Sequence, residues 1–390
     1  MAVKRAKPAA KAVVTRYAHP FFRQTPVTMS ARNRLKAPHM ANWIAQKLGP
    51  IPKPGGASIM DLSQIVGDAG VTEITQAKQI LFHSVGDTGR PNGNGPQEQV
   101  AQAMTADYNI NDTANNPAFF LHLGDVIYGQ NKDNLYRDEF YRPYMTYPGK
   151  IVAVPGNHDG ETFAGTDPTP LGAFLTNFCP PTPIVPKVAA DVRIMRQSVA
   201  QPGVYWLLSA PFVQIIGLYS NIAEGPGHLD GAANDQTQIQ WLKTTLKTVS
   251  DDRKKNGKRA LIIAVHHPPY SNGGHSGSPD MLSQIDGACK SVGIWPDALL
   301  SGHAHNYQRY MRTVAGAGKA PVPYIVAGSG GHNDSAVAAP TGVSGDHDFV
   351  KSNKGFGYLI VKASAATLTI QYWVVPKAGN KPFDEVVVPL

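Results

Sequence analysis

The sequence predicts an α/β fold in which functional side chains follow the ends of strands. Short runs rich in Val, Ile, Leu and Phe end repeatedly in polar turns, which is typical of buried strands. Segments of helical character lie between these runs, and this alternation indicates a sheet with functional groups at its strand ends. The 38 Gly and 32 Pro among 390 residues indicate many turns and argue against a helical bundle.

The expected elements follow from the apolar pattern. Five apolar runs each precede a polar turn, at residues 80–85, 119–123, 151–154, 261–265 and 298–300. Further strands are expected within 204–220 and at 324–328, and the runs at 355–361 and 367–375 predict an antiparallel hairpin. Helices are expected at 97–108, 236–249 and 279–291, with a short one at 40–48.

Basic residues are unevenly placed and divide the chain. Residues 1–60 contain eleven Lys or Arg and no Asp or Glu, although the formal net charge of the whole chain is only +8. We therefore expect residues 1–78 to be a basic N-terminal extension and residues 79–390 to be a single domain. Such an arm could contact nucleic acid or an anionic surface. A solvated extension that wraps the domain is favoured, because no aromatic-interleaved basic motif of a nucleic-acid module is present.

Cysteine content and apolar run length bear on the location of the protein. Cys179 and Cys289 are the only cysteines, which is no disulfide framework and is compatible with a reducing compartment. The first residues lack the apolar segment of a secretory signal. No run reaches the roughly 18 apolar residues of a membrane span. We expect a cytoplasmic protein without a transmembrane segment.

Five short motifs occur in a fixed order, and each places a polar side chain on a tight turn after an apolar run. They are Gly86-Asp87-Thr88-Gly89, Gly124-Asp125-Val126-Ile127-Tyr128, Gly156-Asn157-His158-Asp159, Val265-His266-His267-Pro268 and Gly302-His303-Ala304-His305. One such motif alone is weak, since Gly67-Asp68-Ala69-Gly70 repeats the first pattern and is interpreted as an ordinary turn. The ordered set is far beyond chance. Two metal ions held by carboxylates, an amide and histidines are typical of enzymes that hydrolyse phosphate esters.

Asp125 is the expected bridge of such a site, because one carboxylate can bind two neighbouring cations. Asp87 would bind one cation, and Asn157 would offer the other a neutral oxygen. The histidines would complete the two sets, with His266 and His303 on the Asn157 side and His305 on the Asp87 side. In extended backbone, residues i and i+2 face the same way, so a His-x-His turn can reach two adjacent ions.

Tyr128 indicates which metal is expected. A free phenol has a pKa of about 10, so binding as phenolate at neutral or acid pH needs a strongly polarising cation. Hard anionic oxygen favours Fe³⁺ over Zn²⁺ or Mn²⁺. We therefore expect Fe³⁺ beside a divalent ion, which would be Fe²⁺, Zn²⁺ or Mn²⁺.

The other histidines are interpreted by their position. His266 directly follows an apolar run and is preferred to His267 as the ligand. His83 and His122 lie inside apolar runs and are expected to be hydrogen-bonded core residues. His332 follows a glycine-rich turn, where a loop role and a role behind the ligands are both open.

Residues 160–203 differ from the rest of the chain. They contain seven prolines and little periodicity, which predicts a long Pro-rich loop. A loop of this length inside a compact domain is usually functional or mobile. We expect it to cover part of the mouth of the active site.

The motifs resemble those of the calcineurin-like metallophosphoesterases and, within them, the purple acid phosphatases, whose pattern is DxG, GDxxY, GNH(D/E), VxxH and GHxH. The fourth motif has Ile263 where that family has Val. Asp87-Thr88-Gly89 and Tyr128, in place of the Asp-x-His of the wider superfamily, favour the purple subgroup. The resemblance runs from about residue 80 to about residue 376 and implies a β-sandwich flanked by helices, with the metals at the strand ends.

The resemblance also implies roles for single residues. One metal would be bound by Asp87, Asp125, Tyr128 and His305, and the other by Asp125, Asn157, His266 and His303. His158 and His275 would contact the phosphoryl oxygens or the leaving group, and Asp159 would orient His158 through a hydrogen bond.

The leading hypothesis is therefore a phosphomonoesterase of the acid-phosphatase kind acting on a small phosphorylated substrate. A metal-bound hydroxide would attack phosphorus in line, and His158 or His275 would protonate the leaving oxygen. A phosphodiesterase acting on cyclic nucleotides, phospholipid headgroups or nucleic acid is the main alternative. A metal-free scaffold is disfavoured, because all seven expected ligands are present.

Overall fold

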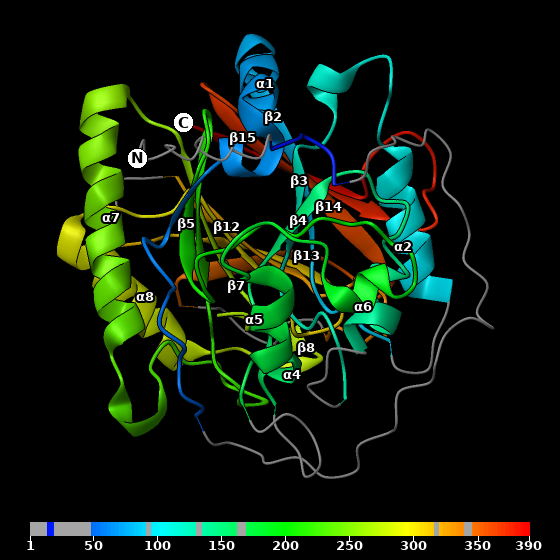
Figure 1. Cartoon of the computed structure of the whole chain (residues 1–390). Coiled ribbons are helices and arrows are strands. Elements are labelled where there is room, and N and C mark those ends of the chain that lie inside the picture. Colours follow the sequence, from blue (N-terminus) through cyan, green and yellow to red (C-terminus); the bar gives the residue numbers. More distant parts are fainter. Residues whose placement is uncertain are drawn as a thin grey trace, which may run out of the picture.

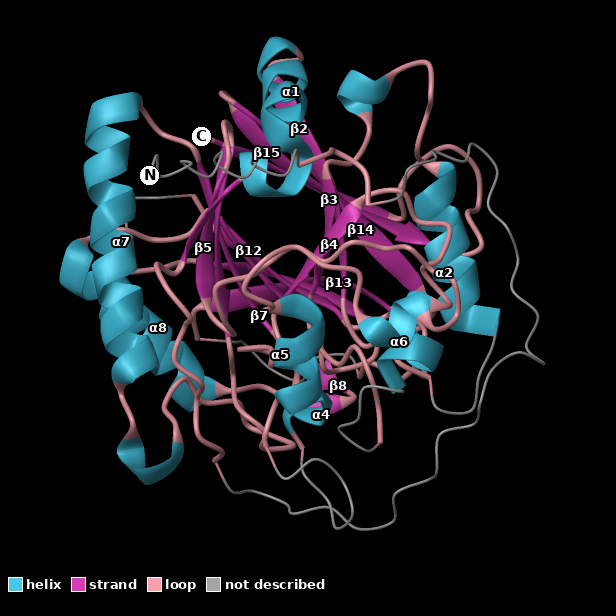
Figure 2. Cartoon of the chain, in the orientation of Figure 1, coloured by secondary structure: helices cyan, strands magenta, loops and turns pink. Residues whose placement is uncertain are grey.

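The computed structural model describes residues 14–18, 48–90, 95–129, 135–161, 169–315, 320–338 and 345–390. Two sheets occupy the middle of the molecule, and helices cover their outer faces (Figures 1 and 2). In Figure 1, α7 and α8 flank one side of the strands, and α2 and α6 flank the other. The predicted α/β fold, a β-sandwich flanked by helices, is confirmed.

The larger sheet has eight strands in the order β1-β5-β6-β7-β10-β12-β11-β13. The strands are β1 (Ile59–Asp61), β5 (Trp206–Ser209), β6 (Val213–Leu218), β7 (Ala260–Val265), β10 (Ala298–Ser301), β11 (Tyr307–Arg312), β12 (Val322–Ala327) and β13 (His347–Asn353). The central strands β6, β7, β10 and β12 are mutually parallel. The C-terminal ends of β7 and β10 therefore lie at the same edge of the sheet.

The smaller sheet has six strands in the order β16-β15-β14-β2-β3-β4. Its strands are β2 (Gln79–Val85), β3 (Phe119–His122), β4 (Lys150–Ala153), β14 (Gly357–Ser364), β15 (Thr367–Val374) and β16 (Asp384–Pro389). Strands β2, β3 and β4 are parallel, and β14 and β15 form the predicted antiparallel hairpin. The polar turns after β2, β3 and β4 thus also share one edge.

Helices connect and cover the strands. They are α1 (Ser63–Gln76), α2 (Gly95–Ala106), α4 (Asn157–Gly160), α5 (Gly172–Phe178), α6 (Lys187–Ala190), α7 (Thr237–Asn256) and α8 (Pro279–Val292), with a π-helical turn η3 (Tyr136–Tyr141) and a small ribbon of β8 (Asn272–Gly273) and β9 (His275–Ser276). The predicted helices at 97–108, 236–249 and 279–291 correspond to α2, α7 and α8. Among the described helices, none combines the length and the apolar character that crossing a membrane requires.

The apolar core has three parts that follow from burial on both faces of each sheet. In β7, Ile262 belongs to the core between the two sheets. Its neighbours Leu261 and Ile263 point the other way, into the core that contains Leu242 of α7 and Ile285 of α8. A third core packs the outer face of the six-stranded sheet against α2, η3 and α5.

The folded core begins before residue 79, so the boundary predicted at residues 78/79 is wrong in part. β1 pairs with β5 in parallel, and α1 buries Ile65, Val66 and Ile74 in the core between the sheets. This segment was not recognised as part of the domain because it begins at the end of the basic residues 1–60. In addition, β1 is only three residues long and the helical periodicity of apolar residues in α1 is weak.

Part of the basic arm also packs on the domain. Arg16 forms an ion pair with Glu73 of α1 and donates to the backbone oxygen of Asn116 at 3.2 Å. Gly67 interrupts α1 with a φ of 74°, and a Cβ there would lie 2.1 Å from the Val14 carbonyl oxygen, so the close crossing requires glycine. The Gly67-Asp68-Ala69-Gly70 repeat therefore lies within α1 and not in a simple turn. The helix predicted at 40–48 lies, apart from its last residue, outside the described residues.

The Pro-rich stretch at 160–203 is packed for much of its described length. It contains α5 and α6, and it buries Leu171, Phe174 and Phe178 in the core beside the six-stranded sheet. Residues 162–168 lie outside the described residues. Coverage of the active-site mouth by this stretch stays a prediction, as do the role of the arm and the cytoplasmic location.

The burial of Lys150 on β4 can be tested. Its side chain on the edge strand β4 is fully buried, its ammonium nitrogen has no hydrogen-bond partner among the described residues, and burial lowers the pKa of Lys150 to about 8. The unfolded chain therefore binds the proton more tightly, so the charged lysine opposes folding at pH 7, and this cost vanishes as pH rises past the unfolded pKa. We expect Lys150→Met to raise the free energy of unfolding by on the order of 2 kcal/mol at pH 7.

Urea denaturation at pH 7 and at about pH 10.5 checks this expectation, because the difference between variant and wild type should shrink at the higher pH. A gain of equal size at both pH values would show that apolar packing and not the charge is responsible.

Candidate metal centre

Strands of both sheets end at one edge of the sandwich, and the candidate ligands lie there. Asp87 follows β2, Asp125 and Tyr128 follow β3, Asn157 opens α4 after β4, His266 follows β7, and His303 and His305 follow β10. The six-stranded sheet thus supplies every oxygen candidate, and the eight-stranded sheet supplies every imidazole candidate.

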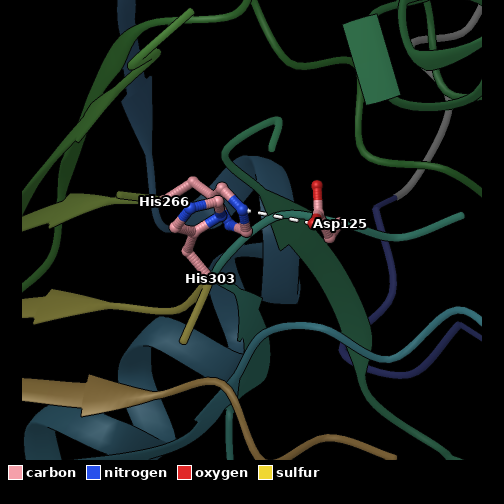
Figure 3. A group of neighbouring side chains, drawn as sticks. All are labelled: Asp125, His266 and His303. Atoms are coloured by element: carbon pink, nitrogen blue, oxygen red, sulfur yellow. Dashed lines mark ion pairs between the residues drawn. The ribbon is translucent and has the colours of Figure 1, made fainter. Parts of the chain in front are cut away.

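Asp125 lies at the centre of this group and is buried. Its Oδ2 lies 3.3 Å from His266 Nε2, and Asp125, His266 and His303 each offer a ligand atom within 4.8 Å of the others (Figure 3). The backbone N–H of His158 donates to Asp125 Oδ1 at 3.0 Å, but Oδ2 has no hydrogen-bond partner among the described residues. A buried carboxylate oxygen that lies beside an imidazole but accepts no well-formed hydrogen bond is incompletely satisfied, which costs free energy. A cation would satisfy it, so the residues present fit a metal ion.

A second group adjoins the first and also contains Asp125. Ligand atoms of Asp87, Asp125 and His305 lie within 4.8 Å of one another. The Tyr128 hydroxyl donates to Asp87 Oδ1 at 3.1 Å and lies 3.1 Å from His305 Nε2. Because Asp125 is common to both groups, it can bridge two cation positions.

The backbone of several candidate ligands is strained. Asp87, Asp125, His303 and His305 have φ values of 58°, 53°, 69° and 43°, which lie in the left-handed region. Such residues cost on the order of 1–3 kcal/mol each and cluster at functional sites. Tight packing holds them, since a Cβ on Gly156 would lie only 2.1 Å from Asp125 Oδ1. Glycine at that position lets the Asn157 turn approach Asp125.

Carbonyl groups behind the imidazoles decide which ring nitrogen faces the centre. His266 Nδ1 donates to the Leu123 carbonyl at 2.8 Å, which turns Nε2 toward Asn157 Oδ1 at 3.1 Å. His303 Nε2 donates to the Glu224 carbonyl at 2.7 Å, which leaves Nδ1 for a cation. Such partners fix the tautomer and orientation of metal-binding histidines.

The charges of these groups depend on one another. Burial disfavours the ionised carboxylate of Asp125, but His266 and then His158 overcome this and hold its pKa well below its ordinary value. Burial also disfavours protonated His266, yet the Asp125 carboxylate raises the pKa of His266 to about 9. Burial and the neighbouring histidines hold the pKa of His303 well below normal. A cation must therefore displace a proton from His266, whereas His303 is already neutral.

Glu224 orients the amide of Asn157. Asn157 Nδ2 donates to Glu224 Oε2 at 3.1 Å, which points the amide oxygen toward His266. Glu224 Oε1 lies 3.6 Å from His275 Nδ1, and burial raises the pKa of Glu224 to about 7. The amide oxygen of Asn157 is therefore a neutral oxygen with a defined direction, as a metal ligand at this position needs.

His158 is held by Glu161 and not by Asp159, so the role expected for Asp159 is corrected. His158 Nδ1 lies 2.9 Å from Glu161 Oε2. Asp159 instead accepts the backbone N–H groups of Gly156 at 2.9 Å and Val126 at 3.1 Å. Its carboxylate therefore ties the Asn157 turn to the Asp125 turn.

Two further histidines adjoin the group. His275 on β9 is partly exposed, and its ring centroid lies 4.1 Å from that of His303. His332 stacks on the Tyr128 ring with centroids 3.4 Å apart, and its Nδ1 donates to the Gly89 carbonyl at 2.6 Å. Of the two roles left open for His332, the position behind a candidate ligand is the one observed.

Three further buried histidines have hydrogen-bond partners outside the candidate ligand set. His267 Nε2 donates to the Ala223 carbonyl at 2.9 Å, and its Nδ1 lies 2.7 Å from Ser220 Oγ, so neither ring nitrogen is free for a cation. His83 lies 3.0 Å from the Tyr147 hydroxyl, and His122 lies 2.8 Å from the Thr88 hydroxyl. The prediction that His83 and His122 are hydrogen-bonded core residues is confirmed.

Three acidic residues at the site were missed. Glu139 of η3 accepts the Tyr128 N–H at 2.9 Å, and π-helical turns are frequent at functional sites. Glu161 follows His158 by three residues, a helical spacing that could have signalled the pair. Glu224 has no local signal, because it lies in a loop far along the chain from its partner Asn157.

Comparisons with known proteins identify the family. The sequence model of the calcineurin-like phosphoesterase family matches residues 81–307. The chain therefore belongs to this family and is a metal-dependent phosphoesterase, a class that typically binds two metal ions. No curated protein matches the chain.

Several solved structures are similar to the chain at low sequence identity. GAP50, the anchor in the inner membrane complex of Plasmodium, is 14% identical with a TM-score of 0.55, over 80% of this chain and 89% of that one. PhoD is 12% identical with a TM-score of 0.46, over 87% and 70%. A dimetal phosphatase from Danio rerio is 12% identical with a TM-score of 0.43, over 80% and 98%. The similarity to GAP50 supports the fold alone.

Adjacent histidines give a matched test of the centre. We expect His266→Ala to weaken binding of one cation by more than the roughly 10–100-fold that loss of a supporting residue costs. His267→Ala serves as the control, because both ring nitrogens of His267 are engaged by Ser220 and Ala223, so this variant should leave both cations in place. Elemental analysis after equilibrium dialysis against Zn²⁺, with thermal melting to verify folding, makes the comparison. Equal metal loss in both variants would contradict the assignment of His266.

Proposed function

We propose that the protein is a dinuclear metal phosphomonoesterase of the acid-phosphatase kind acting on a small phosphorylated substrate. The observation that carries the proposal is the pair of ligand groups that share Asp125. One carboxylate common to two cation positions suits in-line displacement at phosphorus. Membership of the phosphoesterase family supports the same reaction class.

The ligand sets divide between the two positions. One cation would be held by Asp87, Asp125, Tyr128 and His305, and the other by Asp125, Asn157, His266 and His303. When bound, the two cations neutralise phosphoryl charge and activate the attacking water. The protein orients these ligands in advance. His266 is held by the Leu123 carbonyl and Asn157 by Glu224, so little rearrangement is needed during the reaction.

His158 and His275 are the proposed contacts to the substrate. The His158 ring lies 4.5 Å from that of Tyr128, whereas His275 lies beside His303, so the two rings adjoin different cation positions. We assign proton donation to His158, because Glu161 fixes its Nδ1 and directs Nε2 to the other side of the ring. His275 would contact the phosphoryl oxygens.

We also propose that the protein belongs to the purple subgroup, with Fe³⁺ at the Tyr128 position and Fe²⁺, Zn²⁺ or Mn²⁺ at the other. Burial, together with Asp125 and Asp87, raises the pKa of Tyr128 well above its ordinary value. The phenol is therefore neutral beside these carboxylates, and only a strongly polarising cation would ionise it.

Turnover of matched esters tests the reaction. We expect nitrophenyl phosphate to be hydrolysed at least about tenfold faster than its bis-ester by the full chain loaded with iron and zinc or manganese, and Asp125→Asn to lower kcat/KM by at least about 1000-fold. Asp252→Asn is the control, since this carboxylate lies on α7 and pairs with Arg259, which directly precedes β7.

The opposite preference would make the protein a phosphodiesterase. Bound ions without turnover of either ester would contradict the proposed activity.

Removal of the phenol tests the iron assignment. We expect Tyr128→Phe to lose the visible charge-transfer band of the purified protein while it retains two metal ions per chain, because the other ligands of that cation remain. Tyr136→Phe is the control, since its hydroxyl donates to Asp159 and not to Asp87. Absorption spectra and elemental analysis provide the comparison. A colourless wild-type protein with full activity would overturn the iron assignment.

A further inference from the structure

We propose that His158, Glu161 and Glu224 form a third divalent-cation site beside the dinuclear centre. Each of the three offers a ligand atom within 4.8 Å of the others. None of the three belongs to the two ligand groups that share Asp125. The inference goes beyond the proposed function, because it does not depend on which phosphoester is hydrolysed.

The three side chains converge from two segments that are distant in sequence. His158 and Glu161 lie at α4, where a spacing of three residues places both on one side of the turn. Glu224 comes from the loop after β6 and is placed there by the donation from Asn157 Nδ2 to Glu224 Oε2. The fold therefore sets the distance between the two carboxylates.

The burial of Glu161 is a second, independent reason to expect a ligand here. Its side chain is 8% exposed, and its Oε2 lies 2.9 Å from His158 Nδ1. Its Oε1 is buried and has no hydrogen-bond partner among the described residues. An unsatisfied buried carboxylate oxygen costs free energy, and a cation is the ligand that would satisfy it most strongly.

The charge of the cluster selects the class of ligand. Two carboxylates disfavour an anion, and among the described residues their ion-pair partners are His158 and His275. A divalent cation would balance both carboxylates, and the proton between His158 Nδ1 and Glu161 Oε2 would leave to solvent when the cation binds. One imidazole with two carboxylates suits Zn²⁺ or Mn²⁺, and the partial exposure of Glu224 leaves room for water in the remaining positions.

A cation at this position would act on the proposed dinuclear centre through existing contacts. It would use Nδ1 of His158, so Nε2, on the opposite side of the ring, would still face the substrate side. It would also fix Glu224, whose other bonds orient Asn157 and, through the backbone carbonyl, His303. The third cation would thus restrain Asn157 and His303, two candidate ligands of the cation position that also includes His266.

Metal stoichiometry tests the site without reference to activity. The full chain is dialysed against excess Zn²⁺ and analysed for zinc, and we expect about three ions per chain in the wild type and about one fewer in Glu161→Gln. Glu224→Gln is a second variant that should also lose one ion, because it removes one carboxylate from the cluster. Its amide oxygen can still accept from Asn157, so the orientation of Asn157 should be kept. Thermal melting of both variants checks that they fold.

Asp125→Asn is the reciprocal variant. It should lose zinc from the shared positions while an ion remains at Glu161, which anomalous diffraction at the zinc edge would place between His158 Nδ1 and the two carboxylates. Two ions in the wild type, or an unchanged count in folded Glu161→Gln, would overturn the third site. Unchanged zinc in Asp125→Asn would instead overturn the dinuclear centre, so the two failures are distinguishable.

Discussion

The site depends on the docking of two sheets, because neither sheet alone carries a complete ligand set. Parallel strands β2, β3 and β4 bring the oxygen donors to one edge, and parallel strands β7 and β10 bring the imidazoles to the same edge. The core between the sheets, which includes Phe82, Leu121 and Ile262, sets their separation. A shift of one sheet against the other would separate Asp125 from His266. Packing far from the edge therefore controls the geometry of the donors.

Buried charge makes that edge costly to build, and the surrounding contacts offset the cost. The Asp125 carboxylate depends on nearby imidazoles for its ionisation, and four candidate ligands hold left-handed backbone conformations. Backbone carbonyls of Leu123 and Glu224 fix ring orientation, and Asp159 fastens two of the turns together. These supports are what permits strained, charged residues to remain in a single arrangement.

Much of the fold could be predicted from the sequence, because ligand turns and apolar runs are local patterns. The runs before Asp87, Asp125 and Asn157 predicted β2, β3 and β4, and the late hairpin was also predicted. β1 and α1 were missed, because a three-residue strand beside basic residues has no periodic signal and its partner β5 lies far along the chain. Glu224 was missed for the same reason. Asp159 was misassigned, because sequence spacing does not reveal that its carboxylate turns toward the backbone of Val126.

The division of donors between the sheets has a consequence for the order of events during synthesis. The oxygen donors leave the ribosome long before His266, and His303 and His305 emerge still later. Before His266 emerges, the nascent chain holds only the carboxylate, amide and phenol members of the candidate ligand set, which bind hard cations weakly when they are not preorganised. Tight capture must wait until both sheets have closed on each other. Metal binding is therefore expected to follow the docking of the two sheets.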